Sequence, residues 1–500
     1  MLLRSLGPVA LQGFLISAAL LLGRCLPCDQ EQENATIDFT LIHMNDVYEM
    51  TPQGGQGGLA RVAQLEKELA KIQPIFTVLA GDLVSPSAIG LAVVDGEPLA
   101  GKQMIAVMNH FLDFMTFGNH EFDIREQQLL DRLNESTFTW ISSNVSRGSG
   151  APFPGVLRDT ILEIGEGDQG FKVGIFSLTL DSNKQDWVSY DTDLVRLAEQ
   201  HIEQLRQRGA QMIIALTHLE AEEDLALAVA VPAIDLILGG HEHENMHFFR
   251  GKDFTPVAKA DANARTVYIH HIAYDPKDKN IDIRSQLRLI DDRLEEDPET
   301  KAEVTKWETM AFDSFRKQGI EPTQTVATPD LPLDGREGSI RNKATELTRV
   351  LAQGMMAQSG APAALFNSGS IRIDDLIPAG QTLTEYDLLR ILPFGGTVAV
   401  YDIRGDVLKQ ALVQGNLNQG SGGYLQHGNI TLDGERWMIN GNPIVDDKTY
   451  RVAVNDFLAS GKEAGLDFFS TQNKDITLAN ETGEFRDALA KGLKDRFPSR

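Results

Sequence analysis

Five short clusters of polar side chains follow apolar runs in the first half of the sequence, and their residue types could do chemistry. They contain carboxylate, amide and imidazole groups, at Asp46, at Asp82, at Asn119, His120 and Asp123, at His218, and at His241 and His243. A single Gly-Asp pair after a strand is usually a turn, but five such clusters in succession indicate one composite site. The only cysteines are Cys25 and Cys28, so a mature chain without its N-terminal segment would hold any metal ion through oxygen and nitrogen.

The elements that must position these clusters have the pattern of short buried strands separated by helices. Continuous apolar runs predict strands over residues 39–43, 75–79, 114–117, 173–177, 212–216 and 236–238. Helical periodicity predicts helices over residues 59–69 and 194–205 between them. This alternation indicates an α/β or α/β/β-layered domain whose strands end next to the polar clusters.

A second domain is expected after a charged stretch in the middle of the chain. Residues 290–300 are rich in Asp and Glu and lead into a predicted helix over 301–310, where we place the linker. Beyond it, residues 345–356 and 405–414 have helical patterns, and residues 397–401 have a strand-like pattern.

Composition and charge limit which kinds of molecule this protein is expected to bind. The 500 residues carry a formal net charge of -25, which opposes binding to a nucleic-acid polymer or an anionic membrane. A small phosphate ester could still bind beside local cations. Arg4 and the apolar run over residues 9–22 are typical of a secretory signal, and we assign residues 1–28 to it, with a retained N-terminal anchor as the alternative. The mature protein is expected to be periplasmic or secreted and to lack a membrane span.

Several motifs are specific enough to resemble a known family. Gly81-Asp82, Gly118-Asn-His-Glu-Phe-Asp123 and Gly239-Gly-His-Glu-His243 resemble calcineurin-like metallophosphoesterases, and residues 37–480 are similar to the 5'-nucleotidase family. The resemblance implies a four-layer α/β/β/α metallophosphoesterase domain over residues 37–290, a linker helix over 291–320 and a C-terminal α/β 5'-nucleotidase-type substrate domain over 321–500. It also implies two divalent metal ions, chosen from Mn, Zn, Mg, Ca and Fe.

The same resemblance assigns roles to the polar clusters. It implies that Asp82 bridges the two ions, that Asp46 and His243 serve one of them, and that Asn119, His218 and His241 serve the other. Such ligands leave open positions where the ions hold a phosphate and activate a water for in-line attack. His120 is similar to the catalytic histidine, which stabilises the transition state or protonates the leaving alkoxide, and Asp123 to the acid that orients it. From the residues alone, Asp123 could instead cap a helix.

The residues themselves also support predictions for the individual histidines. In an extended segment alternate side chains share a face, so His241 and His243 would both reach one cluster while Glu242 points away as a structural or solvated group. His218 alone could be a core histidine, but the presence of His241 and His243 in the same set of motifs favours a role as a metal ligand. His43 is expected to lie in the core or to support the ligands.

One residue departs from the family pattern at the first cluster. The family usually has Asp-x-His there, whereas Asp46 is followed by Val47 and Tyr48. Tyr48 could ligate as a phenolate, which would favour a hard or trivalent ion such as iron. It could instead support the other ligands while water takes the coordination position.

The second half of the sequence resembles the substrate-recognition half of the same family. Arg341, Asn367 and Arg372 match its nucleotide-binding positions, with Arg336 close to another, and arginine forks suit phosphate or carboxylate groups. Phe394 and Phe457 match the two rings that sandwich a nucleobase, although each alone would be a core residue. The family's Gly-Gly-Asp-Gly-Tyr is replaced by a stretch in which either Glu463 or Asp467 could hold the sugar.

The resemblance therefore predicts an exported phosphoesterase that hydrolyses nucleoside 5'-monophosphates or related esters with a metal-activated water. A cyclic-nucleotide or nucleotide-sugar hydrolase is the alternative within the enzyme class, since the same site can cut a diester. A catalytically inactive nucleotide-binding protein is the alternative outside that class, and Tyr48 motivates it. Rotation of the second domain, which would carry substrate to the metal ions, is a further hypothesis.

Overall fold

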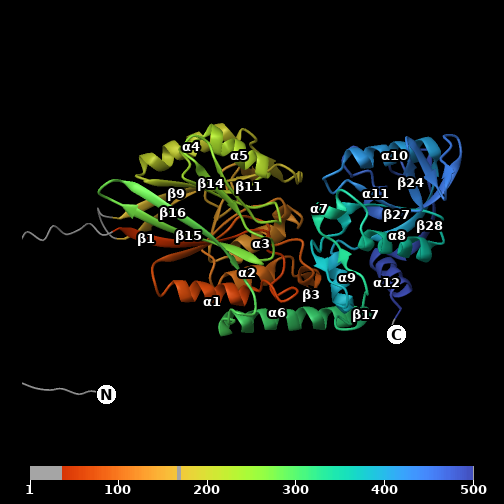
Figure 1. Cartoon of the computed structure of the whole chain (residues 1–500), viewed down its shortest axis with the longest axis horizontal. Helices are drawn as coiled ribbons and strands as arrows, with labels where there is room; N and C mark the ends of the chain where they lie inside the picture. The colour runs from red at the N-terminus through yellow and green to blue at the C-terminus, as the bar shows by residue number, and fades with distance from the viewer. Residues whose placement is uncertain (1–35, 166–169, 499–500) are drawn as a thin grey trace, which may run out of the picture.

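The computed structural model describes residues 36–165 and 170–498 and folds them into two lobes. The predicted signal segment lies outside the described residues. Among the residues it describes, no helix combines the length and apolar character needed to cross a membrane. Helix α6 (Pro298–Lys317) runs along the edge of the first lobe and leads into the second (Figure 1).

Two six-stranded sheets build the first lobe. The first sheet has the order β16-β15-β1-β2-β5-β6 and the second β13-β14-β12-β11-β9-β8. The strands of the first sheet are β1 (Ile37–Met44), β2 (Ile75–Leu79), β5 (Phe114–Thr116), β6 (Thr139–Ile141), β15 (Thr266–Asp275) and β16 (Asn280–Leu289). Those of the second are β8 (Asp159–Ile164), β9 (Phe171–Thr179), β11 (Met212–His218), β12 (Leu236–Gly239), β13 (Met246–Arg250) and β14 (Thr255–Lys259).

The strands that precede the polar clusters pair in parallel. Strand β2 pairs in parallel with both β1 and β5 in the first sheet, and β11 does so with β9 and β12 in the second. Carboxyl ends of parallel strands meet at one edge of a sheet, which brings the clusters together.

Apolar side chains on both faces of the sheets explain why these strands are continuous hydrophobic runs. In β1, Phe39 and Leu41 belong to a core between the two sheets, whereas Ile42 and Met44 belong to a core shared with helices. The helices of this lobe are α1 (Leu59–Leu69), α2 (Lys102–Met108), α3 (Glu126–Glu135), α4 (Leu194–Gln207) and α5 (Ala221–Ala230). Helices α1, α2 and α3 cover the first sheet together with α6, and α4 and α5 cover the second (Figure 1).

The second lobe is built on a five-stranded sheet with helices on both faces. Its order is β23-β19-β27-β22-β28. These strands are β19 (Ala364–Asn367), β22 (Thr397–Arg404), β23 (Leu425–Gly428), β27 (Thr449–Asn455) and β28 (Ile476–Glu484). Helices α8 (Glu346–Ser359) and α12 (Phe485–Arg496) pack on one face, and α10 (Gly405–Leu417) packs on the other.

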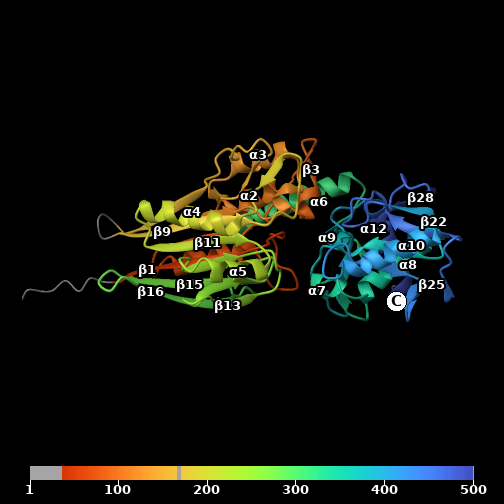
Figure 2. The ribbon, with the colours of Figure 1, turned by 90° about the horizontal axis from the view of Figure 1, so that it is seen from above.

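Short elements complete both lobes. The strands are β3 (Val93–Val94), β4 (Glu97–Pro98), β7 (Val145–Arg147), β10 (Val188–Tyr190), β17 (Thr325–Ala327), β18 (Leu333–Asp334), β20 (Leu376–Ile377), β21 (Leu383–Thr384), β24 (Ile430–Asp433), β25 (Arg436–Ile439) and β26 (Asn442–Pro443). The helices are α7 (Glu337–Ile340), α9 (Glu385–Ile391) and α11 (Asp456–Ala459), with 3-10 turns at Ile89–Leu91, His120–Phe122 and Ser368–Ser370. Helices α7 and α9 lie on the side of the second lobe that faces the first (Figures 1 and 2).

The helix predicted over residues 301–310 is present but longer. It begins at Pro298 because the Asp297 carboxylate accepts a hydrogen bond from the Thr300 amide and caps the first turn. The helices predicted over 59–69, 194–205, 345–356 and 405–414 are confirmed as α1, α4, α8 and α10.

Candidate active site

Backbone conformation at the strand ends aims side chains into a common space. Asp46, Asp82 and His241 have φ of 54°, 60° and 84°, in the left-handed region that non-glycine residues seldom adopt. Such conformations persist only where the surrounding fold enforces them, and they gather at functional sites.

Glycines in the motifs let the loops approach one another. A Cβ at Gly118 would lie 2.1 Å from Asp82 Oδ1, and one at Gly240 would lie 2.2 Å from the Ala80 carbonyl oxygen. These motifs therefore contain glycine because any side chain would push apart the loops that carry the polar groups.

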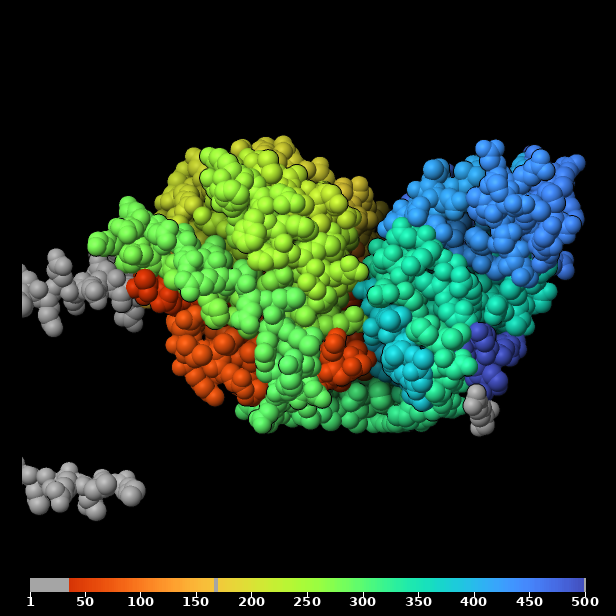
Figure 3. All heavy atoms as spheres, in the orientation of Figure 1, coloured from red at the N-terminus to blue at the C-terminus, as the bar shows by residue number. Residues whose placement is uncertain are grey.

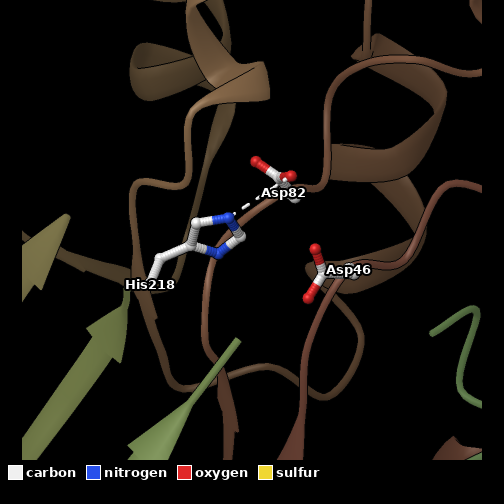
Figure 4. Close-up of side chains that lie close together, drawn as sticks. All are labelled: Asp46, Asp82 and His218. Carbon is white, nitrogen blue, oxygen red and sulfur yellow. Dashed lines mark ion pairs between the residues drawn. The ribbon is translucent and has the colours of Figure 1, made fainter. Parts of the chain in front are cut away.

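Asp46, Asp82 and His218 form the centre of the cluster and point toward one another (Figure 4). Each is buried, and their ligand atoms all lie within 4.8 Å of one another. His218 Nε2 lies 3.4 Å from Asp82 Oδ2, while Nδ1 bonds the Ala80 carbonyl at 2.7 Å and so fixes the ring.

Three other predicted ligands surround this centre. Asn119 Oδ1 lies 3.1 Å from His218 Nε2, and His243 Nε2 lies 3.4 Å from Asp46 Oδ1. The His241 amide donates to Asp46 Oδ2 at 2.9 Å, and its ring lies edge-on to His218 with centroids 5.3 Å apart. The imidazole Nε2 of His241 lies 3.3 Å from Glu220 Oε1. The structure thus places all six predicted ligands in one region.

The expectation of an extended segment at residues 241–243 is wrong. The positive φ of His241 turns the chain, so its ring lies against His218 while His243 faces Asp46. Glu242 does point away from the cluster, where it forms an ion pair with the buried Lys259. Lys259 Nζ also donates to the carbonyls of Leu219 and Gly240, at 2.6 and 2.8 Å, and so anchors this loop.

Tyr48 lies inside the cluster. Its hydroxyl lies 2.9 Å from Asp82 Oδ2, and 3.3 Å from both Asp46 Oδ1 and His243 Nε2. Burial and the carboxylates of Asp82 and Asp46 raise the pKa of Tyr48 well above its usual value. His43 lies in the core as expected, with Nε2 bonded to the Gly239 carbonyl at 3.0 Å.

His120 joins the cluster to the second lobe. Its amide donates to Asp82 Oδ1 at 2.8 Å, and its Nδ1 lies 2.7 Å from Asp123 Oδ2. Arg372 of the second lobe donates from Nη2 to His120 Nε2 at 2.7 Å. Asp123 also accepts hydrogen bonds from Ser85 and Asn183. It ends the 3-10 turn His120–Phe122 through its backbone, while its side chain bonds these partners and His120.

Sequence reasoning gave no role to Glu121, although it lies within the third cluster. This fully buried carboxylate accepts hydrogen bonds from the amides of Asp82, Leu83, Val84 and Gly118. Burial and the neighbouring Asp82 raise the pKa of Glu121 to about 7 despite these donors. Glu121 therefore ties the loop that carries Asp82 to the loop that carries Asn119.

Two acids of the second lobe were also missed. Glu337 pairs with both Arg341 and Arg372, and Asp374 Oδ2 lies 2.7 Å from His243 Nδ1. Asp374 follows Arg372 by two residues, and this proximity is the one signal that could have drawn attention to it. Arg336 is not among these contacts, because it pairs with Asp334.

A cleft of about 340 Å³ opens between the lobes beside the cluster. Its lining includes Glu220, His241 and Glu244 of the first lobe and Glu337 and Arg341 of the second. The space-filling view shows the lobes in contact below and a notch between them above (Figure 3).

The predicted nucleoside-binding residues group on the second lobe. Phe394 and Phe457 are 54% and 45% exposed, too open for the core role that each ring alone would have. Asn367 accepts hydrogen bonds from Ser370 and Asn455. Glu463 lies close enough to Asn367 for that side chain to lower its pKa against the effect of burial, while Asp467 is exposed. Of the two candidate acids, Glu463 is thus the one that lies beside Asn367.

The cluster has the chemistry of a site for divalent cations. Burial alone would lower the pKa of His218, but the carboxylates of Asp82 and Asp46 raise it to about 9. Burial alone would raise the pKa of Asp82, but His218 and His120 hold it well below its usual range. Buried carboxylates that draw positive charge so strongly, beside imidazole and amide donors, fit hard or borderline metal ions.

Comparison with known proteins defines the class. Residues 39–245 match the calcineurin-like phosphoesterase family, and residues 324–471 match the 5'-nucleotidase C-terminal domain. The fold and the site are thus those of a calcineurin-like phosphoesterase domain followed by a 5'-nucleotidase C-terminal domain. Because both domains occur in this order, the chain belongs to the 5'-nucleotidase family of the calcineurin-like metallophosphoesterases, a family of phosphoric ester hydrolases.

Individual relatives agree with this assignment. The chain is 27% identical to protein UshA of Yersinia enterocolitica, with 86% of each chain covered. It is 28% identical to the trifunctional nucleotide phosphoesterase YfkN of Bacillus subtilis, over 85% of this chain but only 32% of that protein. The crystal structure of a 5'-nucleotidase precursor from Thermus thermophilus shares the fold, with a TM-score of 0.73, 23% identity, and 92% and 96% of the two chains covered.

Proposed function

We propose that this protein is an exported 5'-nucleotidase that hydrolyses nucleoside 5'-monophosphates at the interface between its lobes. The observation that carries the proposal is the contact between Arg372 and His120, at 2.7 Å. It joins the predicted nucleotide-binding half to the predicted metal cluster, so one phosphate could meet both. Export rests on the signal-like residues 1–28.

Six side chains would hold two divalent ions. Asp82 would bridge them, Asp46 and His243 would complete one site, and Asn119, His218 and His241 the other. Bound ions would polarise the phosphate and supply the attacking water at neutral pH. Tyr48 would support this set as a neutral phenol, since its hydroxyl donates to Asp82 Oδ2 at 2.9 Å.

His120 would handle the proton of the leaving group. Asp123 accepts a hydrogen bond from Nδ1–H and thereby fixes the ring, so Nε2 is the nitrogen that can exchange protons with substrate. Arg372 occupies that nitrogen as a donor. A substrate phosphate is a stronger acceptor for a guanidinium, so its arrival would draw Arg372 away and free Nε2, which would then take up a proton from solvent and donate it to the leaving oxygen.

The second lobe would select the nucleoside. The exposed rings of Phe394 and Phe457 could stack on either face of a base, which favours nucleotides over simple sugar phosphates. Glu463 and Asn367 would contact the ribose, and Arg341 would lie on the phosphate side of the cleft.

A substrate panel tests this proposal. The protein, supplied with Mn²⁺, is offered AMP, a cyclic nucleotide, a nucleotide sugar and ribose 5-phosphate, and the products are separated by chromatography. We expect adenosine and phosphate from AMP at the highest kcat/KM, and a selective rise in KM for AMP in Phe457→Ala. Equal turnover of ribose 5-phosphate would contradict nucleoside selection, and preferred turnover of the cyclic nucleotide would favour a diesterase.

A further inference from the structure

Asp374 belongs to the second lobe but reaches into the cluster of the first. It has φ of 40°, and its side chain is only 12% exposed. Oδ2 lies 2.7 Å from His243 Nδ1, and Oδ1 accepts the Glu337 amide at 2.7 Å. Arg265 of the first lobe donates to its main-chain oxygen at 3.3 Å. A strained backbone, two engaged carboxylate oxygens and contacts to both lobes mark a residue held in one place.

The partner of Asp374 faces the predicted metal cluster with its other nitrogen. His243 Nε2 lies 3.4 Å from Asp46 Oδ1 and 3.3 Å from the Tyr48 hydroxyl. A carboxylate that accepts from Nδ1–H fixes the tautomer in which Nε2 offers its lone pair. Carboxylates in this position orient metal-binding histidines and make them more basic.

His218, by comparison, is oriented from within the first lobe. Its Nδ1 bonds the Ala80 carbonyl at 2.7 Å. The two histidines therefore differ in what holds them. The ring of His218 is held in place wherever the second lobe lies. The ring of His243 is held by Asp374, which contacts it only when the second lobe is docked against the first.

We propose that Asp374 is a positioning residue that lets the second lobe complete one of the two metal sites. The inference rests on the proposed function, in which His243 binds a metal ion. Affinity for one ion is then coupled to the association of the lobes, and by thermodynamic reciprocity that ion favours their closed arrangement. The other ion is held by first-lobe residues alone.

Metal-binding measurements on the full chain test this inference. Mn²⁺ is titrated by calorimetry into metal-stripped wild type, Asp374→Ala and Asp374→Asn. We expect Asp374→Ala to weaken one of two binding events roughly 10- to 100-fold and to leave the other unchanged. Asp374→Asn should give a smaller loss, because an amide oxygen still accepts from Nδ1–H. His243→Ala should abolish the same event.

Asp375→Ala is the matched control. Asp375 is the neighbouring acid and pairs across the interface with Arg265 at 3.3 Å, so its loss weakens the interface without removing the carboxylate on His243. Because the Asp374 carboxylate still reaches His243 when the lobes are docked, we expect this variant to lose much less Mn²⁺ affinity than Asp374→Ala. Thermal unfolding without metal reports whether each variant folds. If Asp374→Ala does not fold, the Mn²⁺ affinities of Asp374→Asn show whether the Asp374 carboxylate supports this metal site.

Three outcomes would overturn the inference. Wild-type affinities in Asp374→Ala would show that His243 needs no such support. Equal losses in Asp374→Ala and Asp375→Ala would assign the effect to the interface in general. Failure of wild type to bind Mn²⁺ would overturn the proposed function as well, and it would be seen before any variant is compared.

Discussion

Tyr48 sets the character of the cluster at the level of single residues. Its hydroxyl lies near Asp82, Asp46 and His243 at once, yet burial and the two carboxylates favour the neutral phenol by raising its pKa. A neutral phenol donates a hydrogen bond and neutralises no cation charge. We therefore propose that Tyr48 supports the carboxylates through hydrogen bonds and is not itself a metal ligand.

Substitution of Tyr48 distinguishes support from ligation. We predict that Tyr48→Phe still binds two ions, with affinity reduced severalfold by the loss of one hydrogen bond of about 1 kcal/mol. Wild type loaded with Fe³⁺ should show no phenolate-to-iron absorption band in the visible region. A band that disappears in Tyr48→Phe would establish a phenolate ligand and contradict this account.

Substitution of His120 tests the proposed general-acid step. Loss of a general acid lowers kcat by roughly 100- to 10,000-fold, so His120→Ala should lose turnover while keeping its metal content. Steady-state phosphate release and elemental analysis measure the two quantities. His110→Ala, which removes an exposed histidine, is the control and should match wild type. A fully active His120→Ala would exclude His120 as the acid.

At the level of elements, buried Glu121 joins the loops that follow β2 and β5. Its Oε2 accepts hydrogen bonds from the backbone amides of Asp82 and Gly118, and its Oε1 accepts them from those of Leu83 and Val84. The loop positions, and with them Asp82 and Asn119, depend on four hydrogen bonds to one side chain.

An isosteric substitution tests this link. Glu121→Gln replaces one acceptor by a donor that faces amide protons, so we expect a loss of roughly 2 to 5 kcal/mol in the free energy of unfolding and weaker metal binding. Urea denaturation measures the change in the free energy of unfolding. Glu97→Gln, at an exposed ion pair with Arg125, should cost almost nothing. Equal stability of Glu121→Gln and wild type would show that the loops do not need this carboxylate.

The sequence predicted these elements well because the signals are local. Apolar runs followed by Gly-Asp, Gly-Asn-His and Gly-Gly-His located the strand ends, and the sheets brought Asp82, Asn119 and His218 together. The conformation of His241 was not predictable, because a positive φ at a non-glycine residue is imposed by tertiary contacts such as the hydrogen bond from its backbone N–H to the Asp46 carboxylate. The role of Glu121 likewise depends on amides from two separate loops.

At the level of the whole molecule, a buried ion pair helps to hold the lobes together. Arg390 of α9 bonds Glu49 of the first lobe at 2.9 Å, with side chains 7% and 9% exposed, and Tyr386 bonds the same carboxylate at 3.3 Å. Together with Arg372 and Asp374, these residues place the predicted nucleotide-binding half directly against the side chains predicted to bind metal ions.

Removal of Glu49 should loosen this arrangement. Breaking one partner of a buried pair costs about 3 to 5 kcal/mol, so Glu49→Ala should shift the lobes toward separation. Small-angle scattering should then give a larger radius of gyration than for wild type. Asp313→Ala, at an exposed pair with Arg316 on α6, is the control. Identical scattering of Glu49→Ala and wild type would show that other contacts suffice.

Contacts between the lobes are the part of the site that sequence could not supply. The contact of Asp374 with His243 and that of Arg372 with His120 each join residues of different lobes, and Asp374 has no motif of its own. Their roles follow only from how the lobes dock, which depends on surfaces far apart in the chain.

The most direct test of the central claim measures phosphate release from AMP by the metal-stripped protein while Mn²⁺ is added back. We predict no release without metal, full restoration near two ions per chain, and no restoration in Asp82→Ala, which lacks the bridging carboxylate. Release that is independent of metal, or that survives in Asp82→Ala, would contradict a metal-dependent phosphoesterase built on this cluster.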